Sequence, residues 1–230
     1  MLMYSRSNKP GNKGVLSRYK IHIVLFVFGL VLFSLPSLLR FYFYGFGDII
    51  GFPTYLHTRI AGYIIDGTFN FYDPLSFGGR TYVYPPLFSY VLAAFGYVFG
   101  LKAGSVLFVS VFGGLGIVAF YMVMKIFLHR NHAVLAAIVL ALLPVTISLY
   151  SHVSTRAVPT TISLFALYFL IKDHKKYYLH SSVLLGVASL FHPEVAVVFA
   201  IIILLYFLSF RHSLENFLRI VAIVALISAL

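Results

Sequence analysis

Carboxylates are rare in this chain, and most of them fall outside its apolar runs. Only 6 of the 230 residues are Asp or Glu. Asp48, Asp66 and Asp73 follow one another in one polar stretch, and Glu194 stands in the short break "FHPE". A carboxylate can take a proton from an attacking group or bind a divalent cation such as Mg²⁺ or Mn²⁺. Asp48 is therefore a candidate general base or metal ligand, and Glu194 is a candidate second metal ligand.

Cationic and imidazole side chains occur in the same polar segments. Arg156 and His152 belong to "YSHVSTRAVP", between two apolar runs, whereas Arg80 and His57 belong to the stretch that holds the three aspartates. A guanidinium is the best side-chain partner for a phosphate. These four residues form a candidate phosphate site, although an arginine at a membrane face can also serve only to anchor lipid headgroups. His57 has an equally plain interpretation as an interfacial side chain.

Each acidic residue also has a purely structural interpretation. Asp48 can cap a following helix or mark the membrane interface. Glu194 follows a His-Pro pair and can begin a helix, because acids favour the first turn. Asp66 precedes a glycine, which indicates the end of a helix. Asp73 precedes a proline, which is typical of a turn. These structural alternatives stay open for Asp48 and Glu194.

The composition indicates a membrane protein. The chain is 61% hydrophobic and 10% charged, with a mean hydropathy of +0.96, whereas soluble domains carry roughly 25% charged residues. It contains no cysteine, which excludes disulfides and thiolate metal sites. The net charge of +11 comes from basic residues at the ends of apolar runs. That placement indicates membrane topology rather than a nucleic-acid partner.

Apolar runs predict the membrane-spanning helices. Residues 1–20 are basic without an acid and predict a cytoplasmic N-terminus, and 21–44 predict a first transmembrane helix that ends in the aromatic belt "RFYFYGF". No small-residue cleavage site follows it, so this helix is not a signal peptide. Six further spans are expected at 104–124, 133–150, 157–171, 178–191, 195–210 and 214–230.

The segment 84–100 is apolar enough to span as well, and the charge distribution decides its assignment. An interfacial helix on the outer side places 12 of the 17 lysines and arginines in the cytoplasm, whereas a spanning helix leaves only 7 there. The positive-inside rule favours the first arrangement. We therefore expect an all-α, multi-pass protein of the cell membrane with about seven transmembrane helices. Its outer loop, 45–103, carries interfacial helices, the first beginning near Pro53 and ending before Gly67.

These features resemble the N-terminal module of GT-C membrane glycosyltransferases, a superfamily that includes oligosaccharyltransferase catalytic subunits, protein O-mannosyltransferases and aminoarabinose transferases. The resemblance is carried by Asp48 soon after the first span, "DGTFNFYDPLSFGGRTYVYPPL", "MKIFLHRNH", "YSHVSTRAVP" and "LFHPE". It implies transfer of a sugar from a polyprenyl-phosphate donor to an unidentified acceptor outside the cytoplasm. It also implies Asp48 as base or metal ligand, and a C-terminal part beyond 230.

Departures from the family pattern restrict the chemistry. Val83 stands where some relatives have a second acid before the proline pair, and His152 and Arg156 replace acids of the oligosaccharyltransferases. Both departures disfavour metal-dependent transfer to asparagine. A non-catalytic membrane subunit or a transporter is the alternative function, but four of the expected spans contain no ionisable residue, which argues against ion-coupled transport.

Overall fold

The computed structural model describes residues 15–44, 52–75, 78–82, 85–172, 175–210 and 214–228. Within these ranges the chain is almost entirely helical, with one short antiparallel hairpin in which β1 pairs with β2. The elements in chain order are α1 (Val15–Tyr44), α2 (Phe52–Ile65), β1 (Tyr72–Asp73), β2 (Arg80–Thr81), α3 (Leu87–Phe99), α4 (Leu101–Phe127), α5 (Arg130–Leu142), α6 (Pro144–Ser151), α7 (Ala157–Ile171), α8 (Lys175–Phe191), α9 (Pro193–Phe210) and α10 (Leu214–Ser228).

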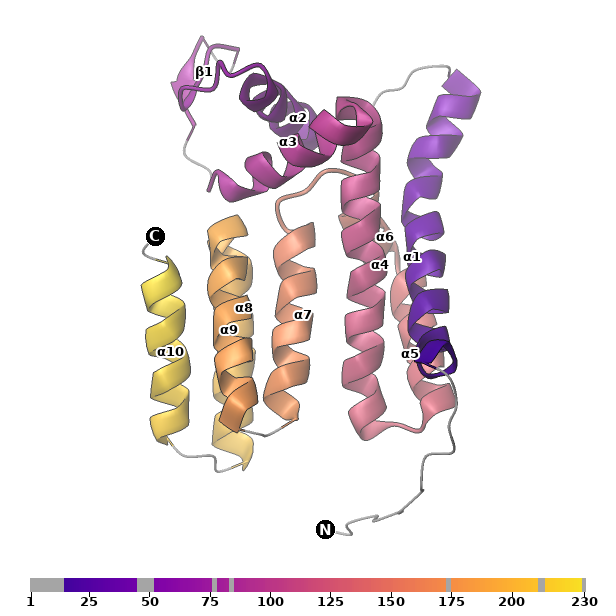
Figure 1. Ribbon diagram of the computed structural model, residues 1–230, viewed down its shortest axis with the longest axis vertical. Coiled ribbons are helices and arrows are strands. Elements are labelled where there is room, and N and C mark those ends of the chain that lie inside the picture. Colours follow the sequence, from indigo (N-terminus) through magenta and orange to yellow (C-terminus); the bar gives the residue numbers. More distant parts are fainter. Residues whose placement is uncertain are drawn as a thin grey trace.

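The long helices stand side by side, and the segment between α1 and α4 covers one end of them (Figure 1). Helices α2 and α3 and the hairpin lie across this end, at a steep angle to α4 and α7. The turns after α6 and α8 reach the same end, whereas the C-terminal ends of α4, α7 and α9 lie at the opposite end. Polar segments distant in sequence are thereby gathered at the end that we call the α2–α3 end.

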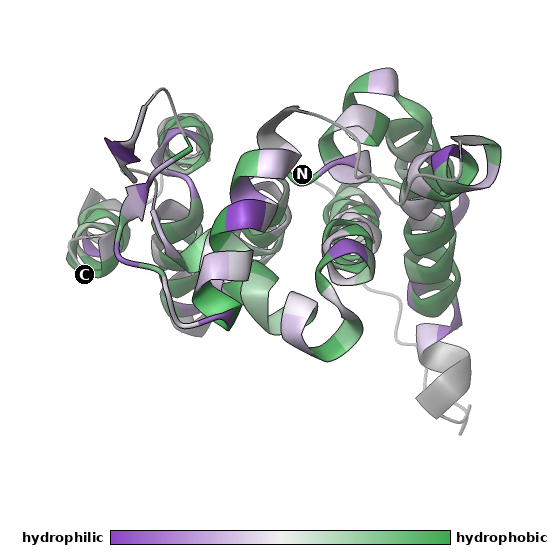
Figure 2. Ribbon diagram, turned by 90° about the horizontal axis from the view of Figure 1, so that it is seen from above, coloured by the Kyte–Doolittle hydropathy of each residue, from purple (hydrophilic) through white to green (hydrophobic). Residues whose placement is uncertain are grey.

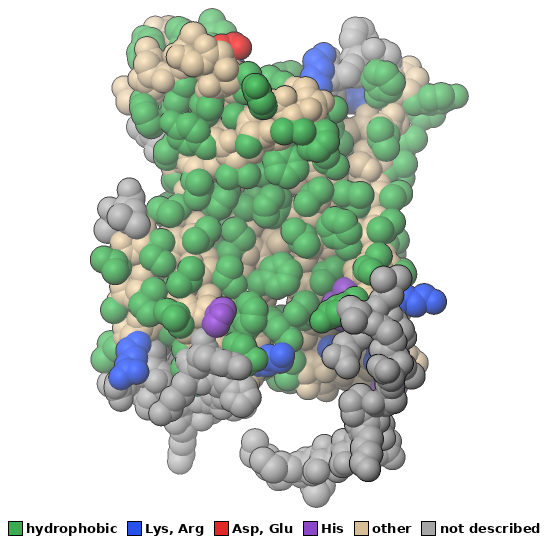
Figure 3. All heavy atoms as spheres, viewed as in Figure 1, with side chains coloured by type: hydrophobic (Ala, Val, Ile, Leu, Met, Phe, Trp, Pro, Cys, Tyr) green, Lys and Arg blue, Asp and Glu red, His purple; other side chains and the backbone are tan. Residues whose placement is uncertain are grey.

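The surface of the bundle is suited to lipid. Hydrophobic side chains cover its flank, and basic side chains appear below them near the opposite end (Figure 3). Seen from above, the hydrophilic residues concentrate in the segments that cross the α2–α3 end, over mostly hydrophobic helices (Figure 2). The expectation of a helical membrane protein is confirmed in this coarse form.

Length and composition identify the clearest spans. Tyr19–Phe43 and Leu101–Phe127 are each long and apolar enough to cross a membrane. Helices α5 and α6 together form a third candidate span if they count as one broken span. The other apolar helices of the bundle are too short, within their described residues, to count as candidate spans by the same criterion. The bounds of α7 coincide with the expected span 157–171, and α3 lies within the segment that was expected to be interfacial.

The expected single helix over 133–150 is wrong. Helices α5 and α6 meet at an angle of 66°. Leu143 between them is extended, with φ −63° and ψ 134°, and Pro144 begins α6. A residue before proline is pushed out of the helical region, and proline suits a first helical turn. The Leu-Pro pair therefore divides this run into two helices.

Glycines allow α1 and α4 to approach closely. A Cβ at Gly29 would lie 2.8 Å from the Cα of Gly114, and a Cβ at Gly114 would lie 2.7 Å from the backbone oxygen of Phe26. Neither distance leaves room for a methyl group, so the two backbones touch. Small residues at this crossing therefore permit the close packing of the two helices.

A polar contact inside the bundle joins α6 and α7 to α4. The hydroxyls of Tyr150 and Thr161 lie 2.9 Å apart, and Thr161 also donates to the backbone oxygen of Phe112 at 2.9 Å. All three elements therefore share one buried hydrogen-bonded position, which holds the turn after α6 in place.

Candidate functional site

Helix α2 is fixed to the turn between α6 and α7 by one buried hydrogen bond. The backbone N–H of Val153 donates to the hydroxyl of Thr54 over 3.0 Å. Both residues are fully buried. Since the two residues are distant in sequence, this bond places the first interfacial helix directly against the "YSHVSTRAVP" turn. The expected end of α2 at Gly67 is confirmed, because this glycine has a φ of 68°.

Arg156 and Glu194 form an ion pair at the α2–α3 end. Nη2 of Arg156 donates to Oε2 of Glu194 over 3.1 Å, and both side chains are exposed. An exposed pair contributes at most about 1 kcal/mol to stability, so its main effect is to orient the groups. A guanidinium carries several N–H donors in a planar fork, and the contact with Glu194 occupies one edge of it.

Two histidines lie beside this pair. His192 connects α8 to α9, and its Nδ1 is buried without a hydrogen-bond partner among the described residues. Burial is the main cause that lowers its pKa. His57 on α2 is buried against the ring of Phe88, with ring centroids 5.1 Å apart. Burial and the nearby imidazole of His192 lower the pKa of His57 to about 4, so His57 is neutral at pH 7.

A second ion pair joins α2 to the hairpin. Arg59 of α2 binds the carboxylate of Asp73 in β1, and the Asp73 side chain is only 2% exposed. The other oxygen of Asp73 accepts the backbone N–H of Leu75 over 3.2 Å, which is the turn geometry expected for this aspartate. Arg80 pairs with Asp73 in the hairpin register and is itself exposed. The hairpin is therefore attached to α2, and no described contact joins Arg80 to Arg156.

The remaining predicted residues divide as follows. His152 ends α6 and is half buried, next to the Val153 anchor. Asp48 lies outside the described residues, as do 45–51 in general. Glu194 occupies the first turn of α9, so its helix-starting interpretation is confirmed. Within the described parts of the chain, no group of three or more His, Cys, Asp or Glu side chains could hold a metal ion, and a divalent-cation site stays a prediction.

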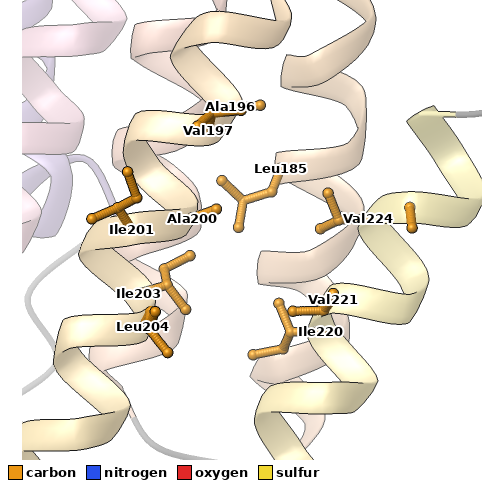
Figure 4. A pocket seen from close by; sticks show the side chains of 11 residues that line it. Leu185, Ala196, Val197, Ala200, Ile201, Ile203, Leu204, Ile220, Val221 and Val224 are labelled. Atoms are coloured by element: carbon orange, nitrogen blue, oxygen red, sulfur yellow. The ribbon is translucent and has the colours of Figure 1, made fainter.

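An apolar groove runs along α8, α9 and α10 and extends to Pro193. Its deeper part has a volume of about 330 Å³ and is lined by aliphatic side chains, including Leu185, Ile203 and Ile220. Figure 4 shows these side chains converging from the three helices on a common space. A second part of about 460 Å³ shares several lining residues and extends to Pro85 and Pro193. The groove therefore ends beside the residues that follow His192.

Sequence reasoning did not find the groove or the Arg59–Asp73 pair. Both depend on which helix faces meet in three dimensions. The "FHPE" break interrupts a long apolar run and thereby indicated His192 in the sequence. That His192 lies close to His57 could be seen only in the folded structure.

Comparison with known proteins identifies the family of this chain. The family model described as dolichyl-phosphate-mannose-protein mannosyltransferase matches residues 83–230. No curated protein matches the chain. The match extends from the segment before α3 to the last helix, and so includes the Arg156 turn, the His192 break and the groove. The chain therefore belongs to the dolichyl-phosphate-mannose-protein mannosyltransferase family, within the GT-C superfamily of membrane glycosyltransferases.

Proposed function

We propose that this protein transfers a sugar from a polyprenyl-phosphate donor to an acceptor at the α2–α3 end of the bundle. The observation that carries the proposal is that the apolar groove reaches Pro193, which stands between His192 and Glu194, the partner of Arg156. A lipid-linked sugar needs both a cationic place for its phosphate and an apolar path for its chain. The donor class agrees with the description of the family.

Arg156 is the principal phosphate ligand in this proposal. Its guanidinium binds Glu194, which adjoins the groove residue Pro193, and can present a planar fork to phosphate oxygens. His192 is near Arg156 and Glu194, and in this proposal its imidazole donates a hydrogen bond to the same group. His57 is neutral at pH 7 and contributes hydrogen bonding rather than charge. These groups accelerate transfer most by stabilising the negative charge that develops on the departing phosphate.

In the same proposal, His152 and Arg80 have smaller roles than Arg156. His152 is half buried in the turn that precedes Arg156, so it lies near the phosphate. Arg80 is exposed on the hairpin, where it adds positive charge to the end of the bundle that the donor phosphate approaches.

Asp48 is proposed as the base that activates the acceptor. It follows the aromatic end of α1 by a few residues in the sequence. General-base assistance typically contributes about 10²- to 10⁴-fold. Asp48→Asn should therefore reduce transfer by about that factor with little loss of thermal stability. Asp66→Asn is the matched control and should retain nearly full activity.

The orientation in the membrane follows from charge. We propose that the N-terminus is cytoplasmic, that the α2–α3 end is outside, and that seven helices span. This arrangement leaves the basic turns after α4, α7 and α9 in the cytoplasm, as the positive-inside rule requires. A divalent cation would bind at Asp48 and Glu194, and the protein would contact membrane lipids along its flank.

Donor kinetics of Arg156 variants test the proposal. Arg156→Lys keeps the charge but loses the fork, and should raise the KM for the polyprenyl-phosphate donor; Arg156→Ala should raise it further. Arg40→Lys and Arg40→Ala are the matched controls, because Arg40 is near the same end but on α1. Unchanged donor kinetics in both Arg156 variants would leave this residue as a lipid anchor.

A further inference from the structure

A second groove opens on the other side of the bundle, between α1 and α4. It has a volume of about 470 Å³, and its walls combine apolar side chains such as Leu30 and Leu107 with Ser34, Ser37 and Ser110. Lys102 is part of the same lining. Helices α1 and α4 lie far from α8–α10 in the bundle (Figure 1), so this groove is separate from the proposed donor groove.

The serine hydroxyls of this groove are the first unexplained feature. Most serines in these helices donate to a carbonyl oxygen of the preceding turn, as Ser34 does to Val31 over 3.0 Å. Ser37 and Ser110 are 8% and 0% exposed, and neither hydroxyl has a hydrogen-bond partner among the described residues. A buried hydroxyl without a partner is costly. Unlike the other buried serines without a described partner, these two line a groove, where a bound molecule can supply the acceptor.

The register of the two helices gives the depth of each group. Gly29 faces Gly114 in an antiparallel crossing, so Ser37 lies near the level of Val106. At 1.5 Å per residue, Ser37 is about 6 Å deeper in the bundle than Lys102, and Ser110 is about 12 Å deeper. The order from the α2–α3 end inward is thus a cation, a first hydroxyl, and a second hydroxyl within an apolar channel.

We infer that the α1–α4 groove binds one anionic glycerophospholipid. The phosphate lies at the Lys102 ammonium, an ester carbonyl accepts the Ser37 hydroxyl, and an acyl chain occupies the groove between Leu30 and Leu107. The order of groups along the groove matches the order along such a lipid, which carries its esters between the phosphate and the chains. A polyprenyl phosphate has a phosphate and a chain but no ester, and so leaves Ser37 without an acceptor. The inference is independent of the proposed function.

Lipid retention by the purified protein tests this inference. Native mass spectrometry would count bound phosphatidylglycerol, its diether analogue and undecaprenyl phosphate, each added separately. We expect diester phosphatidylglycerol to bind at least about fivefold more tightly than the diether analogue, which is the net effect of one hydrogen bond. Ser37→Ala should remove this preference, and Lys102→Gln should weaken both phosphatidylglycerol forms.

Ser163→Ala provides the matched control. Ser163 is also fully buried without a described partner, but it belongs to α7 and is absent from this groove. It should leave binding unchanged. Equal binding of the diester and diether lipids by the unaltered protein overturns the inference, even if a variant fails to fold. A lipid-independent dimer that Ser37→Ala disrupts would also overturn it, because the groove would then hold a helix of a second copy.

Discussion

Removing either partner of the Arg59–Asp73 pair should destabilise the protein, but by unequal amounts. The Asp73 side chain is 2% exposed, whereas that of Arg59 is 28% exposed. Arg59→Met leaves a carboxylate buried without its cation. Such a loss typically costs about 3–5 kcal/mol.

Asp73→Asn should cost much less. An asparagine can still accept the backbone N–H of Leu75 with its one oxygen, which preserves the turn, while its amide nitrogen replaces the oxygen that bound Arg59. The arginine is exposed enough to be solvated in part. We expect a loss of about 1.5–3 kcal/mol, the contribution of one hydrogen bond between charged groups.

Unfolding in sodium dodecyl sulfate, followed by tyrosine fluorescence and circular dichroism, measures both losses. The double variant Arg59→Met with Asp73→Leu should recover stability relative to Arg59→Met alone, because no buried charge remains. A larger loss for Asp73→Asn than for Arg59→Met would refute the reasoning. Losses within about 0.5 kcal/mol for both single variants, the usual effect of a surface substitution, would refute it as well.

Three further predictions follow from the fold. Gly114→Ala should destabilise the protein by about 1–3 kcal/mol, since its Cβ would meet the backbone of α1, whereas Gly62→Ala, whose Cβ has its nearest contact at 3.7 Å, should be neutral or slightly stabilising in the same thermal melts. The pKa of His57 is about 4 in the folded protein and 6.5 in the unfolded chain. The contribution of neutral His57 to the free energy of unfolding should therefore be fully present above pH 6.5 and be lost as the pH falls towards 4, by up to about 3 kcal/mol. A His57→Gln variant whose stability depends on pH in the same way would contradict the assignment. In the cysteine-free chain, an impermeant thiol reagent on intact cells should label Ala103→Cys and spare Asn131→Cys, and the reverse pattern would exclude the proposed topology.

Much of the helical layout could be predicted from the sequence because it depends on local patterns. The apolar run of α7 is bounded by Arg156 and Lys172, and its limits were predicted correctly. Gly67 ends α2 because only a glycine takes positive φ at little cost. The bend at Leu143 was missed, since hydropathy averages over the Leu-Pro pair that breaks the helix.

The site was less predictable because it depends on contacts between distant segments. Arg156 and Glu194 were both candidates, but their pairing follows from how α7 and α9 pack. The Arg59–Asp73 pair needs the hairpin to fold back on α2, which no local pattern specifies. Asp48 lies outside the described residues, and its role rests on the sequence and the family.

The central claim is that a polyprenyl-phosphate donor lies with its phosphate at Arg156 and its chain along α8–α10. A photoreactive polyprenyl phosphate, cross-linked to the reconstituted protein and mapped by mass spectrometry, tests this directly. We predict labelling in 185–204 and 220–225, strongly reduced by Arg156→Ala and unchanged by Lys102→Gln. Labelling that falls instead on α1 and α4, or that is insensitive to Arg156→Ala, would contradict the claim.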